Sequence, residues 1–144
     1  MTADKLHGSW KLVRAYKTVD GRETDSYPLG RNPYGYIHYL PDGRVSVIIA
    51  HDGRVPLTGG RWTSSDAELA ASARTMDAYA GTFAVVAADK VVHYLDISSY
   101  ENDRGTEYPR SMAFADGNLI LGTPEVPGDE GLVGMKLVWA RVAG

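Results

Sequence analysis

The sequence contains no cysteine, and this absence excludes several kinds of chemistry at once. A chain without cysteine has no disulfide, no thiolate nucleophile and no cysteine-ligated metal site. Its four histidines stand at positions 7, 38, 51 and 93, without the close spacing that metal-binding motifs use. Glycine-rich phosphate-binding motifs and a Gly-x-Ser-x-Gly elbow are also lacking. We therefore expect no metal and no resident cofactor.

Long apolar runs and a strong net charge are lacking as well. No apolar run approaches the roughly 18 residues needed to cross a bilayer, and residues 1–11 lack the apolar core of a signal peptide. The net charge of −3 gives no electrostatic reason to expect nucleic acid as a partner. These features predict one domain over residues 1–144, located in the cytoplasm, without a membrane or nucleic-acid partner. The sequence leaves open whether the chain forms a homodimer.

Sequence signals for turns, in contrast, are abundant. Asp-Gly pairs at 20–21, 42–43, 52–53 and 116–117 are strong hairpin signals, because both residues tolerate positive φ. Alternating or apolar runs between turn signals predict strands near 9–19, 35–40, 44–50, 81–88, 90–98, 107–115, 118–123 and 133–143, with a further short strand near 54–62. The pattern predicts an all-β fold, an antiparallel up-and-down β-barrel of eight to ten strands, because closure removes exposed edges.

One segment departs from the strand pattern. Ser65 and Glu68 form a capping box, and apolar residues follow at helical spacing at Leu69, Ala73, Met76 and Ala80. We expect one short α-helix over about 65–78 that packs against the barrel or closes one end. Residues 22–34 and 123–131 are predicted as loops, and the first of them is a natural lid over the barrel mouth.

Strand alternation predicts which side chains face the barrel interior. In the run 90–97, one face carries Val91, His93, Leu95 and Ile97. The corresponding sets in other strands are Arg110, Met112 and Phe114; Val133, Met135, Leu137, Trp139 and Arg141; and Trp10, Leu12, Arg14 and Tyr16. Strand 35–40 is ambiguous, because Tyr36 and His38 oppose Ile37 and Tyr39 and neither set is clearly polar.

Four of the side chains in these sets carry charge or can acquire it: Arg14, His93, Arg110 and Arg141. Arg14 is expected to reach solvent near a rim, so His93 and Arg110 are the two that bear on function. A lone inward histidine such as His93 is more often a satisfied core residue than a catalyst. An inward arginine such as Arg110 is harder to dismiss, because burying it unpaired costs several kcal/mol. It needs a carboxylate, a set of carbonyls or an anionic ligand, and a fixed guanidinium suits a carboxylate or enolate oxygen.

Gly8-Ser9-Trp10 together with Arg141 resembles the Gly-x-Trp motif and terminal arginine of lipocalins, in which the arginine packs across the indole. More of the chain resembles the lipocalin-like domain family, through Gly8–Leu12, Gly35–Tyr39, Pro41–Arg44, Ala78–Gly81, Val91–Tyr94, Arg110 and Leu137–Arg141. This resemblance implies a calycin-type barrel with a cavity for a small, mostly apolar molecule. Similar small barrels also act as cofactor-free cyclases or isomerases in natural-product pathways.

Three functional hypotheses stay open. In the first, the barrel binds a small hydrophobic or aromatic ligand with a polar or anionic end, through Tyr16, Tyr36, His38, Tyr79, Phe114, Met135, Leu137 and Trp139. In the second, it is a cofactor-independent isomerase, cyclase or lyase of a polyketide- or terpenoid-type pathway, with catalytic residues His93, Arg110 and Tyr39. His93 would act as acid or base, and the other two would stabilise an oxyanion. In the third, the polar interior is purely structural.

Overall fold

The structure is a computed structural model that describes residues 2–143. Its strands are β1 (Gly8–Val19), β2 (Arg22–Glu23), β3 (Tyr34–Tyr39), β4 (Arg44–Ala50), β5 (Met76–Ala87), β6 (Lys90–Ser98), β7 (Glu107–Ala115), β8 (Asn118–Gly122), β9 (Val126–Gly128) and β10 (Gly131–Arg141). Its helices are α1 (Thr2–Leu6), α2 (Asp66–Arg74) and the 3₁₀ turn η1 (Glu101–Asp103).

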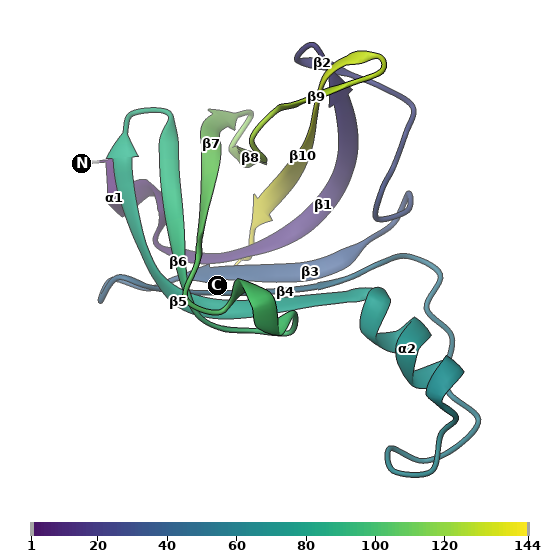
Figure 1. The fold of residues 1–144 in the computed structure, drawn as a ribbon. Helices are drawn as coiled ribbons and strands as arrows, with labels where there is room; N and C mark the ends of the chain where they lie inside the picture. The colour runs from purple at the N-terminus through teal and green to yellow at the C-terminus, as the bar shows by residue number, and fades with distance from the viewer. Residues whose placement is uncertain (1, 144) are drawn as a thin grey trace.

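Eight strands form a closed antiparallel barrel, as the sequence predicts. The strands from β3 to β8 pair in chain order, β8 then pairs with β10, and β1 closes the barrel by pairing with both β3 and β10. The short strands β2 and β9 extend one rim (Figure 1). The Asp-Gly pair at 116–117 forms the β7–β8 hairpin with both residues at positive φ, 54° and 80°.

One end of the barrel is filled by a packed core. Trp10 is buried there, and its indole nitrogen donates to the Leu6 carbonyl oxygen of α1. The Arg141 guanidinium lies 4.0 Å from the Trp10 ring centroid and donates to the carbonyl oxygens of Lys5 and His7. Gly8 allows this approach, since a Cβ atom would lie 2.8 Å from the guanidinium. This contact closes the end at which the chain begins.

The prediction for the helix is only partly correct. The capping box forms, but α2 ends at Arg74 and β5 already begins at Met76. Residues Met76 and Ala80 are four apart, a spacing that places them on one face of a helix and equally on one face of a strand. The helix buries no residue and extends away from the barrel (Figure 1), so it neither packs on the wall nor closes an end. Residues 54–62 form an irregular connection with a bend at 58–59 and a turn beginning at 61, not the predicted strand.

Bulges account for two errors in the predicted faces. A register shift between Leu12 and Arg14 reverses the alternation of β1, so Ala15 faces inward and Arg14 and Tyr16 face outward. A second shift at Gly81 turns Ile97 outward, where it is 62% exposed. The predicted loop at 123–131 contains β9, and the predicted loop at 22–34 begins with β2 and buries Leu29 against the core.

Candidate functional site

The end of the barrel opposite Trp10 holds a cavity of about 350 Å³. This volume lies within the usual range for small-molecule sites. Its apolar lining consists of Leu29, Ile37, Val47, Ile49, Ala78, Leu121, Met135, Leu137 and Trp139. Its polar lining consists of Asp77, Tyr79, His93, Ser98, Ser99, Tyr100, Asp103, Tyr108, Arg110 and Thr123. The polar side chains come mainly from β5 to β7, so one side of the cavity carries the chemistry.

His93 lies at the base of this polar side and has a hydroxyl on each ring nitrogen. The Tyr39 hydroxyl of β3 lies 2.6 Å from its Nε2, and the Tyr79 hydroxyl of β5 lies 2.7 Å from its Nδ1. His93 is 1% exposed and Tyr39 is 0% exposed. The three side chains come from three strands and meet because alternation points each of them inward.

Burial keeps this cluster uncharged. Desolvation, with a smaller contribution from the Arg110 charge, lowers the pKa of His93 from 6.5 to about 3. Burial likewise raises the pKa of Tyr79 to about 12 and the pKa of Tyr39 well above 10.0. At neutral pH the cluster therefore consists of a neutral imidazole between two neutral phenols.

Arg110 of β7 lies beside the cluster and has no carboxylate partner among residues 2–143. One guanidinium nitrogen donates to the Pro109 carbonyl oxygen at 2.9 Å, and the group packs 4.8 Å from the Tyr108 ring centroid. Tyr108 donates its hydroxyl to the Asp103 carboxylate. Burial and this bond raise the pKa of Tyr108. The cavity thus meets a cation whose remaining N–H groups are available to a ligand.

Most of the predicted interior residues do come together. The side chains of His93, Arg110, Tyr79, Met135, Leu137 and Trp139 line the cavity, and Tyr39 lies directly behind His93. In β3 the inward face, which the sequence left ambiguous, carries Ile37 and Tyr39, and both are buried.

The other four predicted ligand-binding side chains lie away from the cavity. Tyr16 lies on the outer wall under the Arg14 guanidinium, as a result of the bulge in β1. Tyr36 and His38 stack on each other on the outer face of β3, with centroids 6.1 Å apart. Phe114 shares the inward face of β7, but it reaches the closed end beside Trp10 and is 40% exposed. None of these four positions gives contact with a molecule in the cavity.

Sequence reasoning missed Tyr108 and Asp103. Tyr108 stands two residues before Arg110 and pairs with His93 across the strands, so alternation alone could have placed it inside. Its ring packs edge-on against Tyr79, with centroids 5.1 Å apart. Asp103 lies in η1, in a connection between strands, and no periodic pattern marks such a residue.

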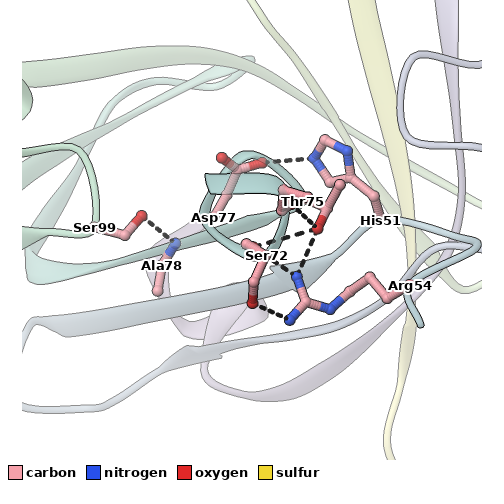
Figure 2. A network of polar contacts seen from close by, with 8 residues as sticks. His51, Arg54, Ser72, Thr75, Asp77, Ala78 and Ser99 are labelled. Carbon is pink, nitrogen blue, oxygen red and sulfur yellow. Dashed lines mark hydrogen bonds and ion pairs between the residues drawn. The ribbon is translucent and has the colours of Figure 1, made fainter. Parts of the chain in front are cut away.

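A polar network ties α2 to the rim of the cavity (Figure 2). Arg54 donates to the Ser72 carbonyl oxygen at 2.8 Å and to the Thr75 hydroxyl at 2.7 Å, at the C-terminal end of the helix. A cation at this end is favourable because the last carbonyl groups of a helix lack partners. Close by, His51 lies 3.2 Å from the carboxylate of Asp77, a residue of the cavity lining.

Residues 2–143 contain neither a helix that could cross a membrane nor a cluster of metal-binding side chains. No helix in this part of the chain is long and apolar enough to span a membrane. Within the same residues, no three histidine, aspartate or glutamate side chains gather in a way that could hold a metal ion.

Comparison with known proteins places the chain in a family. No curated protein matches it. A family model described as a lipocalin-like domain matches residues 7–142, which is nearly the whole chain. The match agrees with the closed barrel and with the Trp10–Arg141 contact at its end. The chain belongs to the lipocalin-like domain family.

Proposed function

We propose that this barrel binds a small, mostly apolar organic molecule whose polar end is anionic. The observation that carries the proposal is Arg110, a guanidinium on the polar side of the cavity that has no carboxylate partner among residues 2–143. A partly desolvated cation of this kind is stabilised most by an anionic oxygen, which takes two N–H groups at once. The barrel fold of the family also supports the binding of a small molecule inside the barrel.

The rest of the cavity fits an apolar body. Leu137, Met135 and Leu121 face it from β10 and β8, and Ile37 and Val47 face it from β3 and β4. Burial of apolar surface contributes about 25 cal/mol per Å², so this part would supply affinity while Arg110 fixes orientation. The ligand would therefore lie with its charged end toward β7 and its apolar end toward β10.

Two fluorescent probes that differ in one charged group test this proposal. 8-Anilinonaphthalene-1-sulfonate carries an anionic group, and N-phenyl-1-naphthylamine is the same skeleton without it. We expect both to bind, with Arg110→Gln weakening the sulfonate probe at least tenfold and leaving the neutral probe within about twofold. Arg44→Gln is the matched control, because Arg44 pairs with Asp96 on the surface.

Failure of either probe to bind the wild-type protein would contradict the proposal. So would an equal loss of both probes in Arg110→Gln, because a lost charge contact acts only on the charged probe. If Arg44→Gln weakened the sulfonate probe as much as Arg110→Gln does, the probe would bind at the surface and not in the cavity.

A second candidate function is a cofactor-independent isomerase, cyclase or lyase of a polyketide- or terpenoid-type pathway. The observation that favours it is a phenol, Tyr79, and a guanidinium, Arg110, on one cavity wall with a neutral imidazole behind the phenol. Such groups stabilise an enolate oxygen while a proton moves to or from carbon. Both His93 nitrogens already contact hydroxyls, so in this scheme His93 would act on the substrate through Tyr79.

Hydrogen–deuterium exchange distinguishes catalysis from binding. An enzyme of this type would accelerate exchange at the α-carbon of an apolar aryl ketone in D₂O, measured by ¹H NMR. His93→Gln would then lower the rate by about 10²–10⁴-fold. A barrel that only binds would leave the exchange rate at its value in buffer, and this outcome would remove the catalytic candidate.

A further inference from the structure

The hydrogen bonds around His93 have a direction that buried polar chemistry determines. A neutral imidazole has one N–H donor and one bare nitrogen, so one tyrosine donates to the ring and the other accepts from it. Two arrangements are possible in principle. Either Tyr39 donates to Nε2 and Nδ1–H donates to Tyr79, or both bonds run the other way.

The burial of Tyr39 selects the first arrangement. Its hydroxyl is fully buried, and among residues 2–143 its one hydrogen-bond partner is Nε2 of His93. If Tyr39 accepted from Nε2–H, its own proton would have no acceptor in a dry environment, which is costly. Tyr39 therefore donates to Nε2. It follows that His93 carries its proton on Nδ1 and donates to the Tyr79 oxygen.

This direction leaves the Tyr79 proton unused by the protein. The Tyr79 oxygen accepts from His93, and no second partner of its hydroxyl occurs in the described part of the chain. Tyr79 lines the cavity, in contrast to Tyr39. Its O–H group is therefore free to donate to a molecule in the cavity.

A second donor faces the same space. Arg110 lies close enough to Tyr79 for its charge to act on the phenol, and both side chains pack against the Tyr108 ring. Of the two acidic residues in the lining, Asp103 already receives the Tyr108 hydroxyl and Asp77 lies 3.2 Å from His51. This part of the wall thus presents donors, O–H and N–H, and it favours an occupant with oxygen acceptors.

We propose that Tyr39 and His93 are positioning residues that fix the Tyr79 hydroxyl as a donor to an oxygen of the ligand, next to Arg110. The ligand class is an apolar molecule that ends in a carboxylate, an enolate or a comparable oxyanion. The inference rests on the proposed binding function for its ligand, whereas the direction of the Tyr39–His93–Tyr79 bonds is a property of the protein alone. No covalent step is involved.

The direction is tested without any ligand. In protein labelled with ¹⁵N at histidine, the His93 signal should show Nδ1 bonded to hydrogen and Nε2 without hydrogen, between pH 6 and pH 8. Tyr39→Phe removes the donor to Nε2 and should shift the Nε2 resonance. A spectrum with the proton on Nε2 would overturn the proposal, whatever the protein binds.

The role of Tyr79 is tested with the two anilinonaphthalene probes. Tyr79→Phe deletes only the hydroxyl, and we expect about tenfold weaker binding of the sulfonate probe and an unchanged affinity for the neutral probe. Tyr36→Phe, a change on the outer wall, is the control and should alter neither.

The outcomes separate the two proposals. If Arg110→Gln weakens the sulfonate probe while Tyr79→Phe does not, the binding function stands and the assignment of Tyr79 is overturned. If the wild-type protein binds neither probe, the binding function fails and the ligand role of Tyr79 fails with it. The His93 spectrum still decides the direction of the bonds in that case.

Discussion

Two clusters, each with two tyrosines and a histidine, lie on opposite sides of the barrel wall. They have the same composition but differ in the strands that they join, in their hydrogen bonds and in their exposure to water. The inner cluster joins three strands through short hydrogen bonds to both imidazole nitrogens, in Tyr39, His93 and Tyr79. The outer cluster lies along β3 alone, in Tyr34, Tyr36 and His38, held by ring contacts and a 3.2 Å hydroxyl pair. The position of a residue in the strand alternation decides which cluster it joins, and only the inner one excludes water.

The largest expected difference is in stability. His93→Leu keeps similar bulk but leaves the buried Tyr39 hydroxyl without an acceptor, so we expect a loss of about 3 kcal/mol in the free energy of unfolding. His38→Leu removes one part-buried contact with Ser9 on the outer wall and should cost about 0.5 kcal/mol or less. Urea unfolding followed by tryptophan fluorescence measures both. Equal losses in the two variants would mean that the hydrogen bonds of the inner cluster contribute no more to stability than the contact between His38 and Ser9.

The second difference is in the response to acid. The pKa of His93 is about 3 in the folded state and 6.5 when unperturbed, so between these values the unfolded chain binds a proton that the folded chain does not. Stability from this group is complete above pH 6.5 and falls as the pH is lowered toward 3, by up to about 1.4 kcal/mol per pH unit.

Variants isolate the contribution of His93 from that of the carboxylates. The difference in unfolding free energy between wild type and His93→Gln should shrink from pH 7 to pH 4. A gap between wild type and His93→Gln that stays constant over this range would contradict the buried neutral imidazole.

The third difference is between a strand position that lines the cavity and a neighbouring position on the outer wall. Val47 and Ile48 are neighbours in β4, but Val47 lines the cavity and Ile48 is 50% exposed on the outside. Val47→Phe should fill part of the cavity and weaken the neutral naphthylamine probe about tenfold, or by about 1.4 kcal/mol. Ile48→Phe should leave its affinity unchanged. Equal effects in fluorescence titrations would place the probe outside the barrel.

The smallest effect is expected for the outer hydroxyl pair. Tyr36→Phe removes a 3.2 Å contact with Tyr34 in a setting where water can replace it, so the unfolding free energy should change by about 0.5 kcal/mol or less. Tyr39→Phe, the inner counterpart, should cost more, about 1–2 kcal/mol, because it leaves Nε2 of His93 unpaired in a dry site. Parallel urea titrations of the two variants compare them directly.

The barrel itself was predictable because its determinants are local. The Asp-Gly pairs at 20–21, 42–43 and 116–117 lie in hairpin turns, whereas the pair at 52–53 lies in the long connection from β4 to α2. Alternation placed His93 and Arg110 inside from short stretches of sequence. Alternation failed where a bulge changes the register, at Leu12–Arg14 and at Gly81. Bulges depend on the partner strand. Gly81, a glycine inside a strand, is a sequence signal for one of them, because a Cβ there would collide with the Tyr94 backbone. No residue of 12–14 marks the other.

The site was only partly predictable, because its contacts join residues distant in the sequence. Tyr39 and His93 are 54 positions apart, and their hydrogen bond depends on the order in which β3 to β6 pair. The spacing of Met76 and Ala80 fits two periodicities, and the tertiary pairing of β5 with β4 decides for the strand. That Arg110 has no carboxylate partner among residues 2–143 is likewise visible only once its surroundings are known.

A crystal structure of the protein grown with 8-anilinonaphthalene-1-sulfonate tests the central claim most directly. The account predicts the naphthalene rings between Leu137 and Val47, with sulfonate oxygens within hydrogen-bonding distance of Arg110 and the Tyr79 hydroxyl. A cavity closed by rearranged side chains, or dye bound only over Tyr36 and His38 on the outer wall, would contradict it.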